Sequence, residues 1–305
     1  ISLSGGNDRV DYLLSGSYYS EEGLFRQHPD KLQKITFRSK ITFDINKWLK
    51  VSNNTSYYNY KYFYPGPSDV NTAFSWSTVH GLASFVPVNT NDDHTDNMST
   101  TTELTWTPVK GLEIKGNFTY MFNTTRYTNR QVNTEYSQYP GEINTLTSGK
   151  MEDKLYEKSM THTYYQANLY GTFERTFARD HNFKAMVGFN WETKFLKDVA
   201  ATGYNLLSET LNDLNLVGQV GGGQNEYALM GFFGRLNYDY KGKYLVEASG
   251  RYDGTSRFKR GQRWGFFPSF SLGWRVSEEA FFDGIRDQFN NLKLRFSYGQ
   301  LGNQN

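Results

Sequence analysis

The 305-residue sequence contains no cysteine, so it forms neither a disulfide nor a thiolate metal site. It has no apolar run of 18 residues, which excludes a transmembrane helix. Only 37% of the residues are hydrophobic, and the mean hydropathy of −0.68 gives no sign of the apolar blocks that a closed soluble core uses. With 33 basic and 31 acidic residues the net charge is only +2, so nucleic acid is not an expected partner.

Catalytic patterns are also missing. The five histidines lack metal-ligand spacing, and no Gly-x-Ser-x-Gly, His-Glu-x-x-His or P-loop pattern occurs. The oxygen-rich run 91–97 offers calcium ligands, but it lacks the glycine and the distal glutamate of an EF-hand, so a solvated loop is the simpler interpretation. We therefore expect no enzyme activity, no cofactor and no metal site.

Aromatic residues and alternation are what the sequence has in abundance. Aromatics make up 17% of the chain. Apolar and polar residues alternate through 33–45 and on both sides of the turn at 240–243, where residues 226–240 and 244–255 predict a β-hairpin. These two runs greatly exceed the usual strand of about 5–6 residues in soluble proteins. Long strands with one apolar and one polar face are typical of membrane barrels.

The same pattern recurs along the whole chain and predicts about 11–12 strands. Short turns alternate with long connections, which we place at residues 63–97, 129–159, 199–225 and 255–263. In outer-membrane barrels short turns face the periplasm and long loops face outward. We therefore predict an all-β fold, a transmembrane antiparallel β-barrel wall. The last connection, 277–290, is expected to hold a helical turn with Ser277 as its N-cap.

Three stretches near the end of the chain carry a family resemblance. Arg251–Phe258 reads RYDGTSRF, residues 264–279 read WGFFPSFSLGWRVSEE, and residues 292–303 read LKLRFSYGQLGN. In this order and spacing they resemble motifs of the SusC/RagA-type TonB-dependent outer-membrane transporters. The start of the chain, with Ser4-Gly5-Gly6, is similar as well, whereas residues 60–225 match in pattern more than in wording.

The resemblance implies a 22-stranded barrel closed by an N-terminal plug, of which residues 1–305 form part of the barrel domain. The plug, the TonB box and the C-terminal strands are then expected outside this chain. It further implies a protein of the bacterial outer membrane, surrounded by lipid, that imports oligosaccharides or peptides with energy delivered through TonB. A SusD-like lipoprotein is the expected partner on the extracellular loops.

Candidate substrate-binding residues crowd the outer end of one expected strand and the loop that follows it: Tyr60, Tyr62, Tyr64, Trp76 and His80. Aromatic faces beside polar groups suit sugar rings and peptide backbones. A packed loop base or a lipid-facing girdle is the plainer interpretation.

Charged residues of the last strands are expected on the inner, lumen face: Arg235, Asp239, Glu247, Arg251, Asp253, Arg257, Lys293 and Arg295. We interpret them as structural charges that form cross-strand ion pairs and seat the plug, in preference to a substrate path.

Two other classes of protein remain open. One is a binding-only or adhesive outer-membrane barrel, which a plug sequence upstream would argue against. The other is a soluble repetitive β protein, which would need a fixed repeat period, whereas the hairpins here vary in length.

Overall fold

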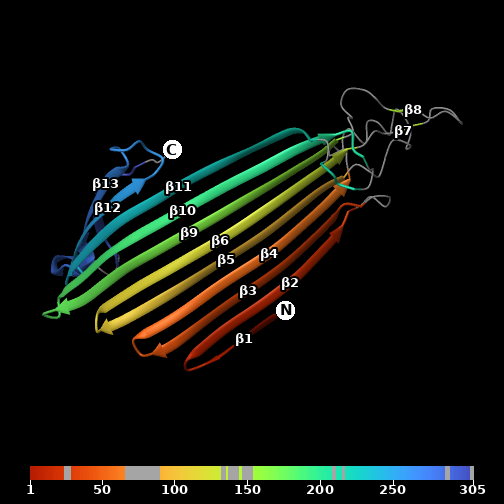
Figure 1. Cartoon of the computed structure of the whole chain (residues 1–305). Coiled ribbons are helices and arrows are strands. Elements are labelled where there is room, and N and C mark those ends of the chain that lie inside the picture. Colours follow the sequence, from red (N-terminus) through yellow and green to blue (C-terminus); the bar gives the residue numbers. More distant parts are fainter. Residues whose placement is uncertain are drawn as a thin grey trace.

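The computed structural model describes residues 1–23, 29–65, 90–131, 135–136, 144–145, 154–207, 211–214, 217–285 and 289–302. Twelve strands form one antiparallel sheet in which each strand pairs with its neighbours in sequence order (Figure 1). They are β1 (Ser2–Asn7), β2 (Val10–Glu22), β3 (Lys31–Asn46), β4 (Leu49–Pro65), β5 (Thr90–Val109), β6 (Leu112–Gln131), β9 (Lys154–Phe177), β10 (His181–Tyr204), β11 (Val217–Tyr240), β12 (Tyr244–Thr255), β13 (Trp264–Arg275) and β14 (Lys293–Gly299). A separate pair joins β7 (Glu135–Tyr136) to β8 (Asn144–Thr145). The predicted antiparallel sheet is confirmed.

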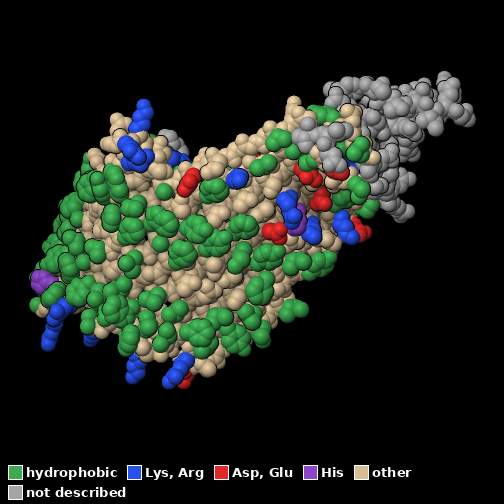
Figure 2. Space-filling view, in the orientation of Figure 1, with side chains coloured by type: hydrophobic (Ala, Val, Ile, Leu, Met, Phe, Trp, Pro, Cys, Tyr) green, Lys and Arg blue, Asp and Glu red, His purple; other side chains and the backbone are tan. Residues whose placement is uncertain are grey.

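The cross-strand register keeps apolar and polar side chains on opposite faces of the sheet. One row places Leu169, Phe189, Phe232, Tyr252 and Phe266 directly opposite one another on β9 to β13. An adjacent row on the same strands, formed by Asn168, Asn190, Gly231, Asp253 and Gly265, belongs to the other side and carries no apolar side chain. We call these sides the apolar face and the polar face. Figure 2 shows hydrophobic side chains spread across many neighbouring strands.

The sheet has no core of the kind found in soluble proteins. Among the described residues only three hydrophobic side chains are buried, Leu155, Val276 and Phe282. Large side chains of the apolar face stay uncovered, including Ile35, Phe37, Phe118, Leu169, Val187, Leu236 and Phe266. A continuous apolar surface of this extent needs an apolar environment, because in water it would drive association. Among the described residues, no helix is long and apolar enough to span a membrane.

Several strands reach further than the sequence predicted. β9, β10 and β11 each have 24 residues, whereas a tilted strand needs about 10 to cross the apolar layer. Residues 90–97, 154–159, 199–204 and 217–225 were expected in loops and lie in strands instead. Where a strand stands clear of lipid, both of its faces can be polar, so the two-residue period disappears from the sequence.

The apolar face ends at the row formed by Tyr57, Met98 and Phe122, which lie opposite one another on β4, β5 and β6. Beyond this row the same face carries mainly polar and charged side chains, with Phe63 as an apolar exception. Residues 58–65, 90–97 and 123–131 therefore extend above the apolar layer.

Glycines 221–223 were expected in a flexible loop, but they lie within β11 and pair with β10. A Cβ at Gly222 would lie 2.7 Å from the carbonyl oxygen of Asp198, so β10 and β11 approach closely there. β12 pairs with β11 only from Leu229 onward. The outer half of β11 thus has β10 on one side and no described strand on the other.

Short turns lie together at one end of the strands (Figure 1), at residues 8–9, 47–48, 110–111, 178–180 and 241–243.

The connection between β13 and β14 lies at this end too, but it is longer and contains the 3-10 helices η2 (Val276–Glu278) and η3 (Ala280–Ile285). Ser277 lies inside η2, and the N-cap position belongs to Arg275. Trp274 Nε1 and Lys243 Nζ each donate to the Glu279 carboxylate, at 3.2 Å. These two hydrogen bonds attach η2 and η3 to the ends of β12 and β13, and they replace the expected Ser277 cap as the contact that holds this connection.

Candidate functional site

Three tyrosines stand on the polar face at the outer end of β4, because Tyr60, Tyr62 and Tyr64 occupy alternate positions of that strand. The rings of Tyr62 and Tyr64 stack with centroids 4.9 Å apart, and those of Tyr60 and Tyr62 are 6.5 Å apart. The register adds Asn91 and Asp93 from β5, and Tyr127 and Asn129 from β6, to the same patch. We call these seven residues the tyrosine cluster.

Hydrogen bonds order the cluster. Tyr62 donates its hydroxyl to Asp30 Oδ2 at 3.0 Å. Asn91 Oδ1 accepts from the Tyr127 hydroxyl at 3.0 Å and from Asn129 Nδ2 at 2.5 Å. Asn91 is only 1% exposed, and its Nδ2 has no partner among the described residues. A buried amide donor without a partner is uncommon, and here it lies beside stacked aromatic rings.

Burial raises the pKa of three phenols in the cluster. It raises the pKa of Tyr62 and of Tyr64. Burial, followed by neighbouring Tyr64 and Asp93, raises the pKa of Tyr127 to about 12. Burial and then the charge of Asp92 raise the pKa of Asp93. The cluster presents hydroxyl and amide groups to the polar face beside the Asp93 carboxyl, which suits hydroxyl-rich or amide-rich molecules.

The raised pKa of Tyr127 predicts a pH dependence of stability. Since the folded-state pKa of about 12 lies above the ordinary value of 10.0, the neutral form favours folding. This stability is fully present below about pH 10 and is lost as the pH rises toward 12. We expect Tyr127→Phe to reduce the alkaline loss of thermal stability of the full-length protein in detergent, measured at pH 8 and at about pH 11.5.

Tyr18→Phe is the matched control, because its side chain is 65% exposed on the opposite face. An alkaline loss in Tyr127→Phe as large as in the unchanged protein would contradict the prediction.

Of the predicted substrate residues, the structure brings Tyr60, Tyr62 and Tyr64 together, whereas Trp76 and His80 lie outside the described residues. Sequence reasoning missed the partners on β5 and β6. Their alternation, Asn91-x-Asp93 and Tyr127-x-Asn129, is a signal that becomes readable only once those segments are known to be strands.

The oxygen-rich run 91–97 forms part of β5, so its side chains alternate between the two faces. Asn91 and Asp93 point to the polar face, whereas Asp92 and Asp96 point to the other. They cannot converge on one ion. Among the described residues no group of three His, Asp or Glu side chains is placed to hold a metal.

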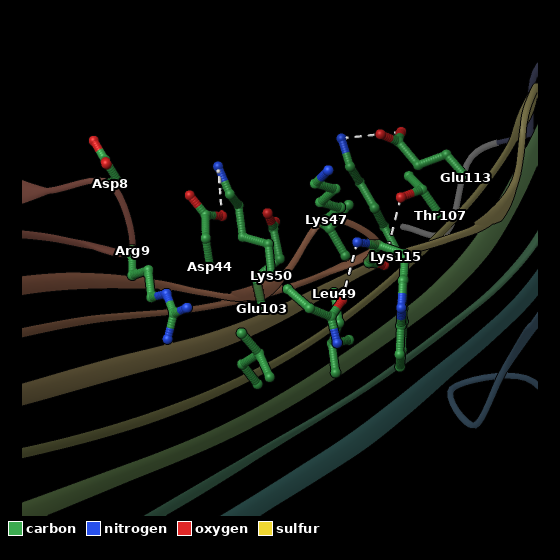
Figure 3. Close-up of a pocket in the computed structure, with 14 residues that line it drawn as sticks. Asp8, Arg9, Asp44, Lys47, Leu49, Lys50, Glu103, Thr107, Glu113 and Lys115 are labelled. Atoms are coloured by element: carbon green, nitrogen blue, oxygen red, sulfur yellow. Dashed lines mark hydrogen bonds and ion pairs between the residues drawn. The ribbon is translucent and has the colours of Figure 1, made fainter.

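Near the short turns the polar face carries ion pairs, which we call the charged belt. Pairs between neighbouring strands are Asp44–Lys50 at 3.2 Å, Glu174–Lys184 at 3.1 Å and Arg235–Glu247 at 3.9 Å. Glu113 and Lys115 pair within β6 at 3.2 Å. Figure 3 shows Asp44, Lys50, Glu113 and Lys115 rising from the same side of the sheet, around a hollow of about 920 Å³.

The other charges predicted for the inner face are held by local contacts. Arg251 donates two hydrogen bonds to Asp253 on its own strand, at 3.1 and 3.0 Å, and its guanidinium lies 5.3 Å from the ring centre of Phe233. Further contacts are Asn182 Nδ2 to Asp239 at 3.2 Å, Arg295 Nε to Ser271 Oγ at 3.1 Å, and Arg257 at 4.3 Å from the ring centre of Tyr227. Arg257 lies in the loop between β12 and β13.

An amide row crosses the middle of the polar face. Asn168 Nδ2 donates to Asn117 Oδ1 at 2.8 Å, and Asn190 Nδ2 donates to Asn168 Oδ1 at 2.6 Å, which links β6, β9 and β10. The row lies between the tyrosine cluster and the charged belt. Hydrogen-bonding groups therefore lie at both ends and in the middle of the polar face.

Comparison with known proteins decides the family. Residues 11–303 match the family model described as TonB dependent receptor-like, beta-barrel. The chain belongs to the TonB-dependent receptor-like β-barrel family. The resemblance to SusC/RagA-type receptors that the sequence motifs indicated is confirmed.

Relatives of this barrel are named TonB-dependent receptors. TonB-dependent receptor P26 of Formosa agariphila is 26% identical over 339 residues, covering 100% of this chain and 32% of that protein. SusC of Bacteroides thetaiotaomicron is 46% identical over 77 residues, 25% of this chain and 8% of its own length. The RagAB peptide transporter shares the fold, with a TM-score of 0.74 at 20% identity over 98% of this chain and 36% of that one.

The chain spans about a third of the curated relatives it matches, for example 32% of TonB-dependent receptor P26. Those relatives are receptors and transporters rather than enzymes. The barrel lies in the outer membrane, so its apolar face meets lipid, its polar face lines the interior, and its short turns face the periplasm.

Proposed function

We propose that the full-length protein imports oligosaccharides or peptides across the outer membrane, with energy delivered through TonB and with a SusD-like lipoprotein on its extracellular loops. The observation that carries this proposal is the tyrosine cluster, which lies at the outer end of the interior face of a TonB-dependent receptor barrel. A substrate entering from outside would meet this patch first.

The chemistry of the cluster supports a polar substrate that is rich in hydroxyl or amide groups. Stacked rings such as Tyr62 and Tyr64 offer flat surfaces to sugar rings or peptide planes. The buried amide of Asn91 and the protonated phenols supply hydrogen bonds that fix orientation. The amide row then continues the polar lining toward the periplasmic end. The proteins named for comparison include a peptide transporter, RagAB.

The remaining parts of the machinery belong to the full-length protein. We propose that the plug and the TonB box precede this chain and that further barrel strands follow it. The charged belt and Arg251–Asp253 would then hold the wall and seat the plug.

Uptake by intact cells tests the proposal. Cells that express the full-length protein should accumulate labelled oligosaccharide or peptide, and a protonophore should abolish accumulation, because the energy comes from the inner membrane. A strain lacking the gene should lose this uptake. Binding at the cell surface without energy-dependent uptake would instead identify a binding-only or adhesive barrel.

A single substitution tests the site. We expect Tyr62→Ala to weaken substrate binding about 2–10-fold, because one aromatic contact contributes about 0.5–1.5 kcal/mol. The measurement is isothermal titration of the purified full-length receptor with the substrate identified by uptake. Tyr18→Ala is the control, since Tyr18 stands near the outer end of β2 but on the apolar face. Equal effects of the two substitutions would remove the tyrosine cluster from the substrate path.

A further inference from the structure

A row of basic side chains crosses three strands on the lipid-facing side, just above the end of the apolar face. Lys61 on β4, His94 on β5 and Arg126 on β6 lie directly opposite one another. Neighbouring strands are about 4.8 Å apart, which places the backbones of Lys61 and Arg126 about 10 Å from each other. Figure 2 shows charged and histidine side chains gathered beyond the hydrophobic region, toward the outer ends of the strands.

Asp96 lies one row nearer the apolar face, and its carboxylate contacts His94 and Arg126. Its Oδ1 accepts hydrogen bonds from Asn59 Nδ2 at 2.7 Å and from the Tyr57 hydroxyl at 2.8 Å. Its Oδ2 lies 3.2 Å from His94 Nε2 and 3.9 Å from Arg126 Nη2. Arg126 Nη2 also contacts His94 Nδ1 at 3.0 Å. The network fixes His94 and Arg126 before any ligand arrives.

Four groups thus engage the negative charge of Asp96. Burial alone would raise the pKa of this carboxyl, but the hydrogen bonds from Asn59 and Tyr57, with the charges of His94 and Arg126, outweigh it and lower the pKa. Arg126 keeps a side chain that is 58% exposed, and Lys61 forms no ion pair with any described residue. Asp92, one position further out on the same face, is the next acidic side chain of β5.

The position of the row excludes a part in the interior passage. It faces away from the tyrosine cluster, because Lys61 and Tyr62 are adjacent residues of one strand and point to opposite faces. The next row down on the same face is Asn59, Asp96 and Thr124, and below it lie Tyr57, Met98 and Phe122, the last row of the apolar face. A molecule that contacts both levels must carry an apolar tail and a polar head.

We propose that Lys61 and Arg126 bind the phosphorylated head group of an outer-leaflet lipid whose acyl chains lie along the apolar face below, while His94, with both ring nitrogens engaged by Asp96 and Arg126, holds Arg126 in position. Arg126 presents paired N–H donors that match phosphate oxygens, and Lys61 adds a point charge two strands away. Cations at a membrane surface attract anionic head groups most strongly within the first layer. The protein thereby holds a lipid at a fixed place on its wall.

The test uses the full-length protein, delipidated in a neutral detergent, and native mass spectrometry of bound lipid. The probes are a diphosphorylated glycolipid of the lipid A type, its dephosphorylated counterpart with the same acyl chains, and inorganic phosphate. We expect only the phosphorylated lipid to bind tightly. Lys61→Gln should weaken it about 5-fold and the double variant K61Q/R126Q about 30-fold.

The control is K47Q/K110Q, which removes the same charge from exposed residues of the periplasmic turns and should leave binding unchanged. Lys61→Gln breaks no hydrogen bond of the described structure, so it tests the proposal even if loss of Arg126 impairs folding. Equal binding of the dephosphorylated lipid, binding of inorganic phosphate alone, or an unchanged affinity in Lys61→Gln would each overturn it.

Discussion

Replacing Val187 by arginine is expected to destabilise the folded barrel by about 2–4 kcal/mol, the usual penalty for a cation at the centre of a lipid-facing wall. Val187 is 68% exposed on the apolar face. It lies midway along the crossing of β10, between His181 at the turn and Phe195, which is level with the end of the apolar face. Its direct cross-strand neighbours are Gly171 and Gly234, so an arginine there would have no side chain opposite it on either neighbouring strand. The loss would therefore come from the lipid rather than from a clash.

Thr172→Arg is the matched control for this prediction. Thr172 lies one residue away from Gly171 on the polar face and directly opposite Glu113, so a cation there remains in water and near an acid. Reversible urea unfolding of the full-length protein in lipid vesicles compares the two free energies of unfolding. We expect Thr172→Arg to change stability by less than about 1 kcal/mol. Equal losses in both variants would mean that Val187 does not face lipid.

Gly111→Ala is expected to destabilise the protein by about 2–5 kcal/mol. Gly111 closes the turn between β5 and β6 with φ of 89°, a conformation that costs a residue with a Cβ about 1–2 kcal/mol. A Cβ there would also overlap the carbonyl oxygen of Glu174. The Gly111 carbonyl accepts from the Glu174 amide at 2.7 Å, so the two backbones cannot separate without losing that bond. Overpacking of this kind adds about 1–3 kcal/mol.

Gly261→Ala separates the two contributions. Gly261 has almost the same φ, 91°, but no atom lies within 4 Å of the position its Cβ would take. Gly261→Ala should lower the free energy of unfolding only by the cost of the positive φ, about 1–2 kcal/mol. The difference between the two variants in chemical unfolding measures the contact with Glu174. If both lose the same amount, the close approach of β6 and β9 at this turn is not rigid.

The lipid-crossing part of the fold was readable in the sequence because the membrane imposes a period. In β3, for example, Ile35, Phe37, Ile41 and Phe43 must meet lipid while the residues between them must meet water, so alternation survives without a packed core. The hairpin of β11 and β12 was predicted for the same reason, with its turn at residues 240–243, and the structure has the turn at 241–243.

The segments outside the apolar layer show no such alternation of apolar and polar residues. Residues 90–97 resemble a polar loop because β5 has water on both sides there, and only pairing with β4 and β6 makes them a strand. The connection at 277–290 was expected to start from a Ser277 cap, whereas contacts of Glu279 with Lys243 and Trp274 hold it. These are tertiary contacts that local sequence does not encode.

The candidate site divides in the same way. Tyr60, Tyr62 and Tyr64 were found from their spacing, but Asn91, Asp93 and Tyr127 joined them only through the register across β4, β5 and β6. The sequence by itself determined the fold class and the alternating faces, because lipid and water sort side chains at every second position, and its three motifs near the end of the chain indicated the family. Only the tertiary structure decided which residues of different strands stand side by side, because register depends on hydrogen bonding along whole strands.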